Sequence, residues 1–185
     1  MITYRILAAK DAELYHALRL EALKNNPEAY ASDLMTEQKR TMDQIRAHLD
    51  DPYVMTVGGY DGERMIAIAS LHLEKLPKMA HRSTLTSVYV NPEYRGRRVS
   101  RHMMEYMIER VKKRGITKMY LYVMTHNASA IRAYRKFGFD IIGEDREAMK
   151  EPHGYVDEYL MVKYLVKPAV PAAAHVYPDH QSNNQ

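Results

Sequence analysis

The sequence predicts an α/β (α+β) fold, in which helices cover the faces of a mixed sheet. Two observations support this class. Strand-like and helix-like segments follow one another in the order strand, two helices, three strands, helix, strand, helix, two strands. The pair Asp61-Gly62, set between two apolar runs, is typical of a hairpin turn and therefore joins two neighbouring strands.

The N-terminal part is expected to form one strand and two helices. Residues 2–8 form a short apolar strand, and Asp11 is placed to cap the helix that follows. Asn25-Asn26-Pro27 ends that helix, and a second helix is expected over residues 36–49. The residues expected to face the core are Leu14, Ala17, Leu18 and Ala22 in the first helix, and Met42, Ile45 and Leu49 in the second.

Three strands come next, over residues 53–60, 65–73 and 84–90. The middle one is apolar on both faces, which is typical of an interior strand. The third ends at Asn91-Pro92. The remaining elements are a helix over 99–111, a strand over 119–124, a helix from Asn127 to Lys136, and two strands over about 139–149 and 154–165.

Glycine and proline mark the ends of these last elements. Gly115 and Gly138 each suit the end of a helix, because glycine readily adopts the left-handed conformation found there. Asn127 is a good helix N-cap. Pro152-His153-Gly154 is expected to form the turn between the last two strands.

The length of 185 residues suits one domain, expected over residues 1–166, with a flexible tail over residues 167–185. That tail is rich in proline, alanine and polar residues and has no periodicity. A net charge of +4 is too small to indicate a nucleic-acid-binding protein by itself. The sequence has no cysteine, which excludes disulfides, cysteine–zinc sites and a cysteine acyl-enzyme.

The N-terminal residues lack the apolar core of a signal peptide, and no stretch approaches the roughly 18 apolar residues of a membrane span. A cytoplasmic protein without a membrane partner is therefore expected.

A phosphate-binding candidate lies where a strand end meets a helix start, over residues 91–101. Unpaired N–H groups and the helix dipole make a helix N-terminus attractive to a pyrophosphate. Gly96 permits close backbone approach. The segment also carries the polar side chains of Arg95, Arg97, Arg98, Ser100 and Arg101. The alternatives are a solvated arginine cluster or a nucleic-acid patch, and the latter lacks aromatics spaced for base stacking.

A second candidate cluster begins the helix at Asn127. Asn127, Ala130 and Tyr134 follow the spacing i, i+3 and i+7, so they share one helical face. The Asn127 amide can cap the helix or bind a ligand amide, Ala130 permits close approach, and Tyr134 presents a phenol. The alternative is a capped amphipathic helix with Tyr134 half-buried in the core.

Taken together, VYVNPEYRGRR and NASAIRAYRKFGF, separated by a helix and a strand, resemble the GCN5-related N-acetyltransferase (GNAT) superfamily over roughly residues 3–165. The resemblance implies a mixed, mostly antiparallel sheet of about seven strands with helices on both faces. It also implies acetyl-CoA as co-substrate, and no metal.

The resemblance further assigns site residues. The pantetheine arm is expected to hydrogen-bond along the strand residues Val88, Tyr89 and Val90. The pyrophosphate is expected on the loop and first helical turn formed by Arg95, Gly96, Arg97, Arg98, Val99, Ser100 and Arg101. Asn127 and Ala130 are expected beside the cofactor, and Tyr134 near its sulfur as the general acid.

Two features depart from the family pattern. Arg98 and Ser100 stand where the pattern has glycine or alanine, and residues 84–87 lack the glutamate that many members carry on this strand. These departures leave open an alternative, a non-catalytic GNAT-fold protein that senses acyl-CoA or binds a partner.

The enzyme hypothesis is a direct attack by a primary amine in a ternary complex. The amine is expected to belong to a small molecule, with a protein amine as the other possibility, and the enzyme could form a homodimer. No nucleic-acid partner is expected. The proton of the amine could leave through a water relay from backbone carbonyls or to a side chain. The candidate side chains are Glu21, Glu28, Asp157, His72 and His81.

Overall fold

The computed structural model describes residues 1–166, so the expected tail over residues 167–185 lies outside the described residues. The helices and strands are β1 (Ile2–Ile6), α1 (Ala12–Asn25), α2 (Leu34–Gln38), α3 (Met42–Asp50), β2 (Val54–Asp61), β3 (Arg64–Leu73), β4 (Arg82–Val90), α4 (Val99–Lys113), β5 (Lys118–Met124), α5 (Ala128–Lys136), β6 (Asp140–Glu151) and β7 (Gly154–Tyr164).

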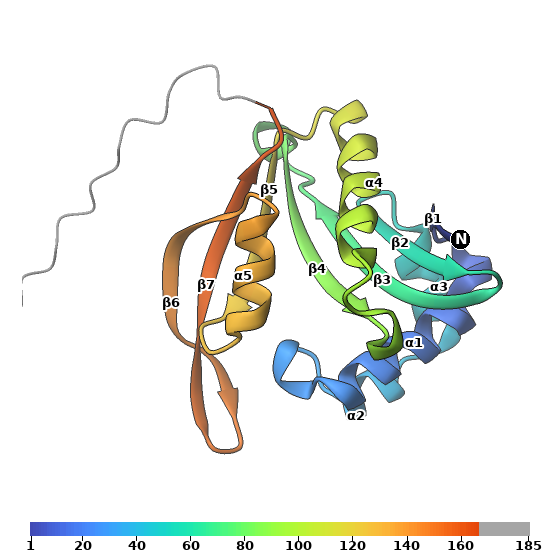
Figure 1. Cartoon of the computed structure of the whole chain (residues 1–185), viewed down its shortest axis with the longest axis horizontal. Coiled ribbons are helices and arrows are strands. Elements are labelled where there is room, and N and C mark those ends of the chain that lie inside the picture. The colour runs from blue at the N-terminus through green and yellow to red at the C-terminus, as the bar shows by residue number, and fades with distance from the viewer. Residues whose placement is uncertain (167–185) are drawn as a thin grey trace, which may run out of the picture.

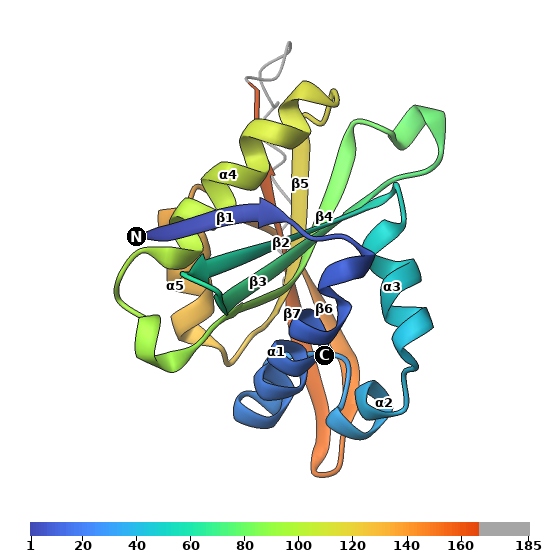
Figure 2. The same ribbon diagram turned by 90° about the vertical axis from the view of Figure 1, so that its right-hand side faces the viewer.

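The strands of the described residues form one seven-stranded sheet in the order β1-β2-β3-β4-β5-β7-β6 (Figure 1). Every neighbouring pair is antiparallel except β4 and β5, which are parallel. β1, β2 and β3 lie side by side in Figure 2. The prediction of a mixed, mostly antiparallel sheet of about seven strands is confirmed.

Helices cover both faces of the sheet, and each face has its own apolar core. On one face, α1 and α3 bury residues such as Tyr15, Leu18 and Ile45 against β2 and β3. On the other face, α4 buries Met103 and Met107, and α5 buries Ile131. Burial of these side chains is the main stabilising contribution, roughly 1.5–3 kcal/mol for each large one.

Two details of the N-terminal predictions are wrong. The helix expected over residues 36–49 is two helices, because Thr41 and Gln44 form a capping box that starts α3 afresh. In α1, Leu14 and Ala17 are exposed, and the buried positions are Ala12, Tyr15, Leu18, Arg19, Ala22 and Leu23. Leu18 and Ala22 were expected to face the core and do so.

Asp11 stands just before α1 as predicted, but its carboxylate does not cap that helix. It accepts two hydrogen bonds from the Arg5 guanidinium, each 2.7 Å long, and one from the Ala8 N–H. The Arg5 hydrogen bonds lower the pKa of Asp11. Asp11 therefore ties β1 to the turn that leads into α1.

Candidate active site

The sheet opens between β4 and β5. Their parallel ladder pairs only Arg82–Thr84 with Lys118–Tyr120, and the two strands then diverge toward the bottom of Figure 1. Asn91 N–H bonds back to β3. Because successive strand residues alternate the direction of their backbone groups, Val88 and Val90 turn theirs toward the opening.

A β-bulge shapes β4 at this point. Its register with β3 shifts between Ile68 and Ser70, and Ser87 adopts a left-handed φ of 56°. Two carbonyls beyond the bulge are already used: Tyr30 Oη donates to the Val88 O at 3.0 Å, and Arg95 Nε donates to the Val90 O at 3.2 Å. The carbonyl groups of the strand edge that was expected to bind the pantetheine arm therefore already accept hydrogen bonds from side chains of this protein.

The loop before α4 presents a row of unused hydrogen-bond donors. Within the described residues, the backbone N–H groups from Gly96 to Arg101 donate no hydrogen bond, and the first helical bond of α4 starts at His102 N–H. The first turn of α4 carries no acidic residue. Consecutive free N–H groups at a helix N-terminus form a site for an anion such as a pyrophosphate.

The arginines of this loop differ in their freedom. Arg95 is tied to Val90 and to the Asn26 Oδ1 at 2.9 Å, Arg97 lies over the Tyr94 ring, and Arg101 pairs with Glu105 at 3.0 Å. Arg98 is exposed, and the described residues give it no side-chain partner.

Arg98 takes a conformation that suits glycine. Its φ of 61° and ψ of 18° are left-handed, at the N-cap of α4. The position at which the sequence departs from the glycine pattern is thus one where the backbone still has glycine's geometry. A non-glycine residue there costs about 1–2 kcal/mol.

We expect Arg98→Gly to stabilise the fold. It removes the left-handed strain and a positive charge from the positive end of a helix, offset by the flexibility of glycine in the unfolded chain. A net gain of about 1 kcal/mol corresponds to a Tm increase of roughly 2–4 °C, measured by calorimetry. The matched control is Arg97→Gly, where φ is not positive, and there Tm should fall. A Tm for Arg98→Gly at or below that of the wild type would contradict the strain argument.

Helix α5 forms the opposite wall of the opening. Asn127 caps it, since its Oδ1 accepts from Ala130 N–H at 3.1 Å. Of the two possible roles for this amide, capping is therefore seen, while its Nδ2 has no partner among the described residues. Ile131 anchors α5 in the core.

Tyr134 lies on the same helix and lines the opening. Its ring packs edge-on against Phe139, with ring centroids 5.8 Å apart. The hydroxyl makes no hydrogen bond within the described residues. Burial raises the pKa of Tyr134 to about 12, so the phenol is neutral and a proton donor at physiological pH.

Three neighbouring hollows, which share lining residues such as Tyr30, make up the candidate site. The donor cleft, about 560 Å³, lies between β4, the 95–101 loop and α5. The acceptor cavity, about 440 Å³, lies between α1, α2, β4 and β7. A small junction chamber of about 130 Å³ shares Tyr134 with the donor cleft and Glu158 with the acceptor cavity. Of the residues expected at the cofactor site, those that line the donor cleft are Val88, Tyr89, Val90, Arg95, Ser100, Arg101, Asn127, Ala130 and Tyr134. Gly96, Arg97, Arg98 and Val99 do not line it, and Val99 is buried in the core.

The sequence-based candidates for the base are dispersed. Glu21 accepts hydrogen bonds from Tyr89 Oη and Asn91 Nδ2, and Asp157 accepts from Glu147 N–H, so both carboxylates are engaged in holding local structure. His81 lies just before β4, and its carbonyl accepts hydrogen bonds from the N–H groups of Thr117 and Lys118 at the start of β5. Glu28 lines the donor cleft, and His72 lines the acceptor cavity.

Sequence reasoning missed Glu158, the neighbour of Asp157 on β7. Among the described residues, it is the only carboxylate that lines the junction chamber. Burial, together with the charge of Asp145, raises its pKa. Asp145 is its cross-strand partner on β6. The period-two alternation of a strand separates positions 157 and 158 onto opposite faces, but the sequence alone does not say which face meets the chamber.

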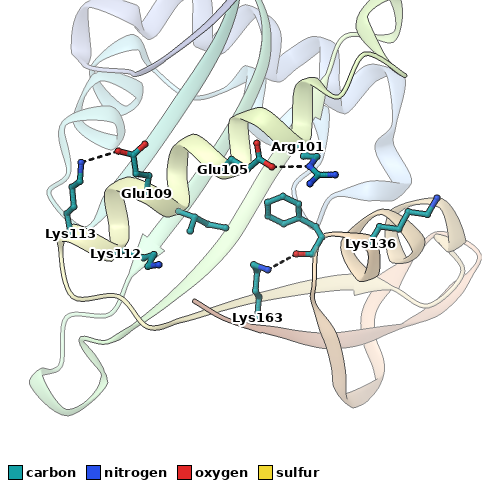
Figure 3. Close-up of a pocket in the computed structure, with 9 residues that line it drawn as sticks. Arg101, Glu105, Glu109, Lys112, Lys113, Lys136 and Lys163 are labelled. Atoms are coloured by element: carbon teal, nitrogen blue, oxygen red, sulfur yellow. Dashed lines mark hydrogen bonds and ion pairs between the residues drawn. The ribbon is translucent and has the colours of Figure 1, made fainter. Parts of the chain in front are cut away.

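A further basic hollow of about 740 Å³ lies between α4 and α5 (Figure 3). Arg101, Lys136 and Phe137 line both it and the donor cleft. Lys163 donates to the Phe137 O at 2.7 Å, whereas the Lys112 and Lys136 ammonium groups make no hydrogen bond or ion pair within the described residues (Figure 3). This hollow extends the positive charge of the donor cleft around the molecule.

The sequence matches the acetyltransferase (GNAT) family over residues 12–139, more than half of the chain. The protein belongs to the GNAT family. Two relatives illustrate its range. The mycothiol acetyltransferase of Brachybacterium faecium is 27% identical over 141 residues, which cover 74% of this chain and 40% of that enzyme. The bS18-alanine N-acetyltransferase of Salmonella typhimurium is 26% identical over 122 residues, which cover 63% of this chain and 82% of that enzyme.

Solved structures of GNAT proteins share this fold. A GNAT acetyltransferase from Streptococcus pneumoniae superimposes with a TM-score of 0.78 at 20% identity, covering 89% of this chain and 99% of that one. The yncA protein of Salmonella typhimurium, solved with its cofactor acetyl-CoA, gives 0.78 at 18% identity, covering 94% and 99%. Members of this family are acetyltransferases, and acetyl-CoA is the co-substrate of the family.

No helix within residues 1–166 has the length and apolar character needed to cross a membrane. In the same residues, no group of three or more histidine, aspartate or glutamate side chains is placed to hold a metal ion.

Proposed function

We propose that this GNAT protein is an N-acetyltransferase that acetylates a primary amine of a small molecule by direct attack in a ternary complex. The observation that carries the proposal is the junction chamber. It shares lining residues with both the donor cleft and the acceptor cavity, and its own lining includes a neutral phenol and a carboxylate of raised pKa. Cytoplasmic location and a homodimer remain predictions from the sequence.

The residues present fit acetyl-CoA. The free N–H groups of residues 96–101 and the arginines around them would hold the pyrophosphate, with Arg98 free to add its charge. The N–H groups of Val88 and Val90, together with Asn127 Nδ2, would hold the pantetheine arm. When bound, acetyl-CoA supplies the acetyl group as a reactive thioester.

Two side chains would move protons during transfer. Glu158 would take a proton from the acceptor amine as its nitrogen bonds to the acetyl carbon, and its raised pKa improves its strength as a base. Tyr134 would give its proton to the sulfur as the carbon–sulfur bond breaks, and would regain it from water. A phenol is a suitable donor to a thiolate, whose ordinary pKa is about 8.5. The backbone N–H of Val88 would polarise the carbonyl.

Blocking the donor cleft tests this assignment. Ala130 lines both the cleft and the chamber, so Ala130→Leu should abolish acetyl-CoA binding in isothermal titration while the wild type binds at a single site. The matched control is Ala128→Leu on the exposed side of the same helix, which should bind like the wild type. Wild-type binding by Ala130→Leu, or no binding by the wild type at millimolar ligand, would overturn the donor site.

A further inference from the structure

The acceptor cavity contains a buried cation with an unused donor. Arg19 is only 5% exposed and lines the cavity from α1. Its Nη1 atom is buried and has no hydrogen-bond partner within the described residues. Its guanidinium stacks on the ring of Tyr30, 4.6 Å from the centroid, and Tyr30 in turn holds the Val88 carbonyl. Arg19 is thus packed against Tyr30, and its buried Nη1 donor is unused.

The carboxylate beside it does not neutralise the site. Glu37 is 4% exposed, accepts a 3.1 Å hydrogen bond from Arg40, and lies 4.0 Å from Arg19 Nε. One carboxylate is therefore shared by two guanidinium groups. His48 and His72 also line the cavity, and burial lowers the pKa of both, so they are neutral at physiological pH. An excess of positive charge remains at this end.

The two ends of the acceptor cavity carry opposite charges. Arg19, Arg40 and Glu37 line the acceptor cavity but not the junction chamber, whereas Glu158 lines both. A second buried atom without a partner, Thr86 Oγ1, belongs to a residue that also lines both. A ligand that spans the cavity therefore meets a cation at one end and a carboxylate, near the reacting centre, at the other.

We propose that the acceptor is a small amine that also carries a carboxylate, such as an amino acid, with its carboxylate on Arg19 and its amine toward Glu158. A carboxylate would pair with the Nη1 donor, and a polar group buried without a hydrogen-bond partner is costly. The N-terminus of a peptide would bring a neutral amide to the same place and leave the excess positive charge uncompensated. This proposal rests on the proposed N-acetyltransferase function and names its substrate class.

Matched acceptors test the proposal on the wild-type enzyme. Initial rates would be measured for a panel of amino acids, for the corresponding amino-acid amides, and for a short peptide with a free N-terminus. We expect kcat/KM to be about 100-fold higher for the acids than for the amides, because a site built for a polar group rejects analogues that lack it. Amides or peptides that react as well as the acids would overturn the proposal.

Substitution of Arg19 tests the residue itself. Arg19→Met keeps the length of the side chain and should remove the preference, lowering kcat/KM for acids about 100-fold and leaving the amides within a few-fold. An equal loss for both classes would overturn the assignment. Arg46→Met, an exposed arginine of α3 paired with Asp43, is the control and should keep the wild-type preference. If Arg19→Met does not fold, the acid–amide comparison on the wild type still decides.

The two proposals fail differently. If the donor site is absent, the wild type neither binds acetyl-CoA nor acetylates any amine. If only the acceptor class is wrong, acetyl-CoA binds and amines are acetylated, but without a preference for those that bear a carboxylate.

Discussion

Tyr134→Phe is expected to lower kcat about 100-fold, the lower range of what one general acid contributes. The substitution removes only the hydroxyl that would protonate the departing sulfur. The ring still packs against Phe139, so the affinity for acetyl-CoA should stay within about twofold of the wild type. Single-turnover rates and isothermal titration on the same preparation measure the two quantities.

The pH dependence gives an independent check. The pKa of Tyr134 is raised to about 12, so the phenol keeps its proton throughout the range in which the protein can be assayed. The wild-type rate should therefore show no fall on the alkaline side up to about pH 10. Tyr164→Phe, an exposed tyrosine at the end of β7, serves as the control. Wild-type kcat in Tyr134→Phe would exclude the acid role.

Glu158→Gln is expected to lower kcat/KM about 100-fold to 1,000-fold at neutral pH, because the neutral amide keeps the shape of the side chain but cannot accept the amine's proton. The loss should shrink as the pH rises toward the pKa of the free amine, since the acceptor then arrives already deprotonated. Glu144→Gln, an exposed carboxylate on β6 beside the same strand pair, should behave like the wild type.

The partner of Glu158 makes the assignment sharper. The negative charge of Asp145 contributes to raising the pKa of Glu158, and a base is lost when the pH falls below its pKa. Asp145→Asn should therefore lower that pKa and shift the acid limb of the kcat/KM profile to lower pH. An acid limb that does not move, or a Glu158→Gln enzyme as active as the wild type at neutral pH, would show that another group takes the proton.

The sequence anticipates much of the fold because its signals are local. Gly115, Gly138 and Asn127 mark helix ends by their own backbone or capping preferences, and the structure places helix ends there. Thr41 and Gln44 also carried a local signal, a capping box that separates α2 from α3, but it lay inside a run with helical periodicity. Leu14 and Ala17 were wrongly expected to face the core, because the prediction relied on the spacing of apolar residues. The buried face of α1 is instead set by the tertiary packing of Tyr15 and Arg19.

The candidate site likewise has a part that local sequence signals predict and a part that they do not. The donor cleft is lined largely by two continuous segments whose motifs are visible in the sequence, although Gly96, Arg97, Arg98 and Val99 of the first segment do not line it. The acceptor cavity gathers Arg19, Tyr30, Glu37 and Glu158 from α1, the segment after it, α2 and β7. No motif links these positions, because only the closing of the sheet against α1 and α2 brings them together. The bulge at Ser87 is likewise a matter of register between strands.

The free N–H groups of residues 96–101 also bear on how such a loop can change over evolutionary time. Backbone donors are supplied by every residue type except proline, so the binding surface does not depend on which side chains the loop carries. Residues such as Arg98 and Ser100 can therefore stand where the family pattern has glycine or alanine and still present their N–H groups to an anion. Such a residue lowers the stability of the fold where the backbone is left-handed, as it is at Arg98. The sequence of this loop can therefore vary at the expense of stability, while the backbone donors stay the same.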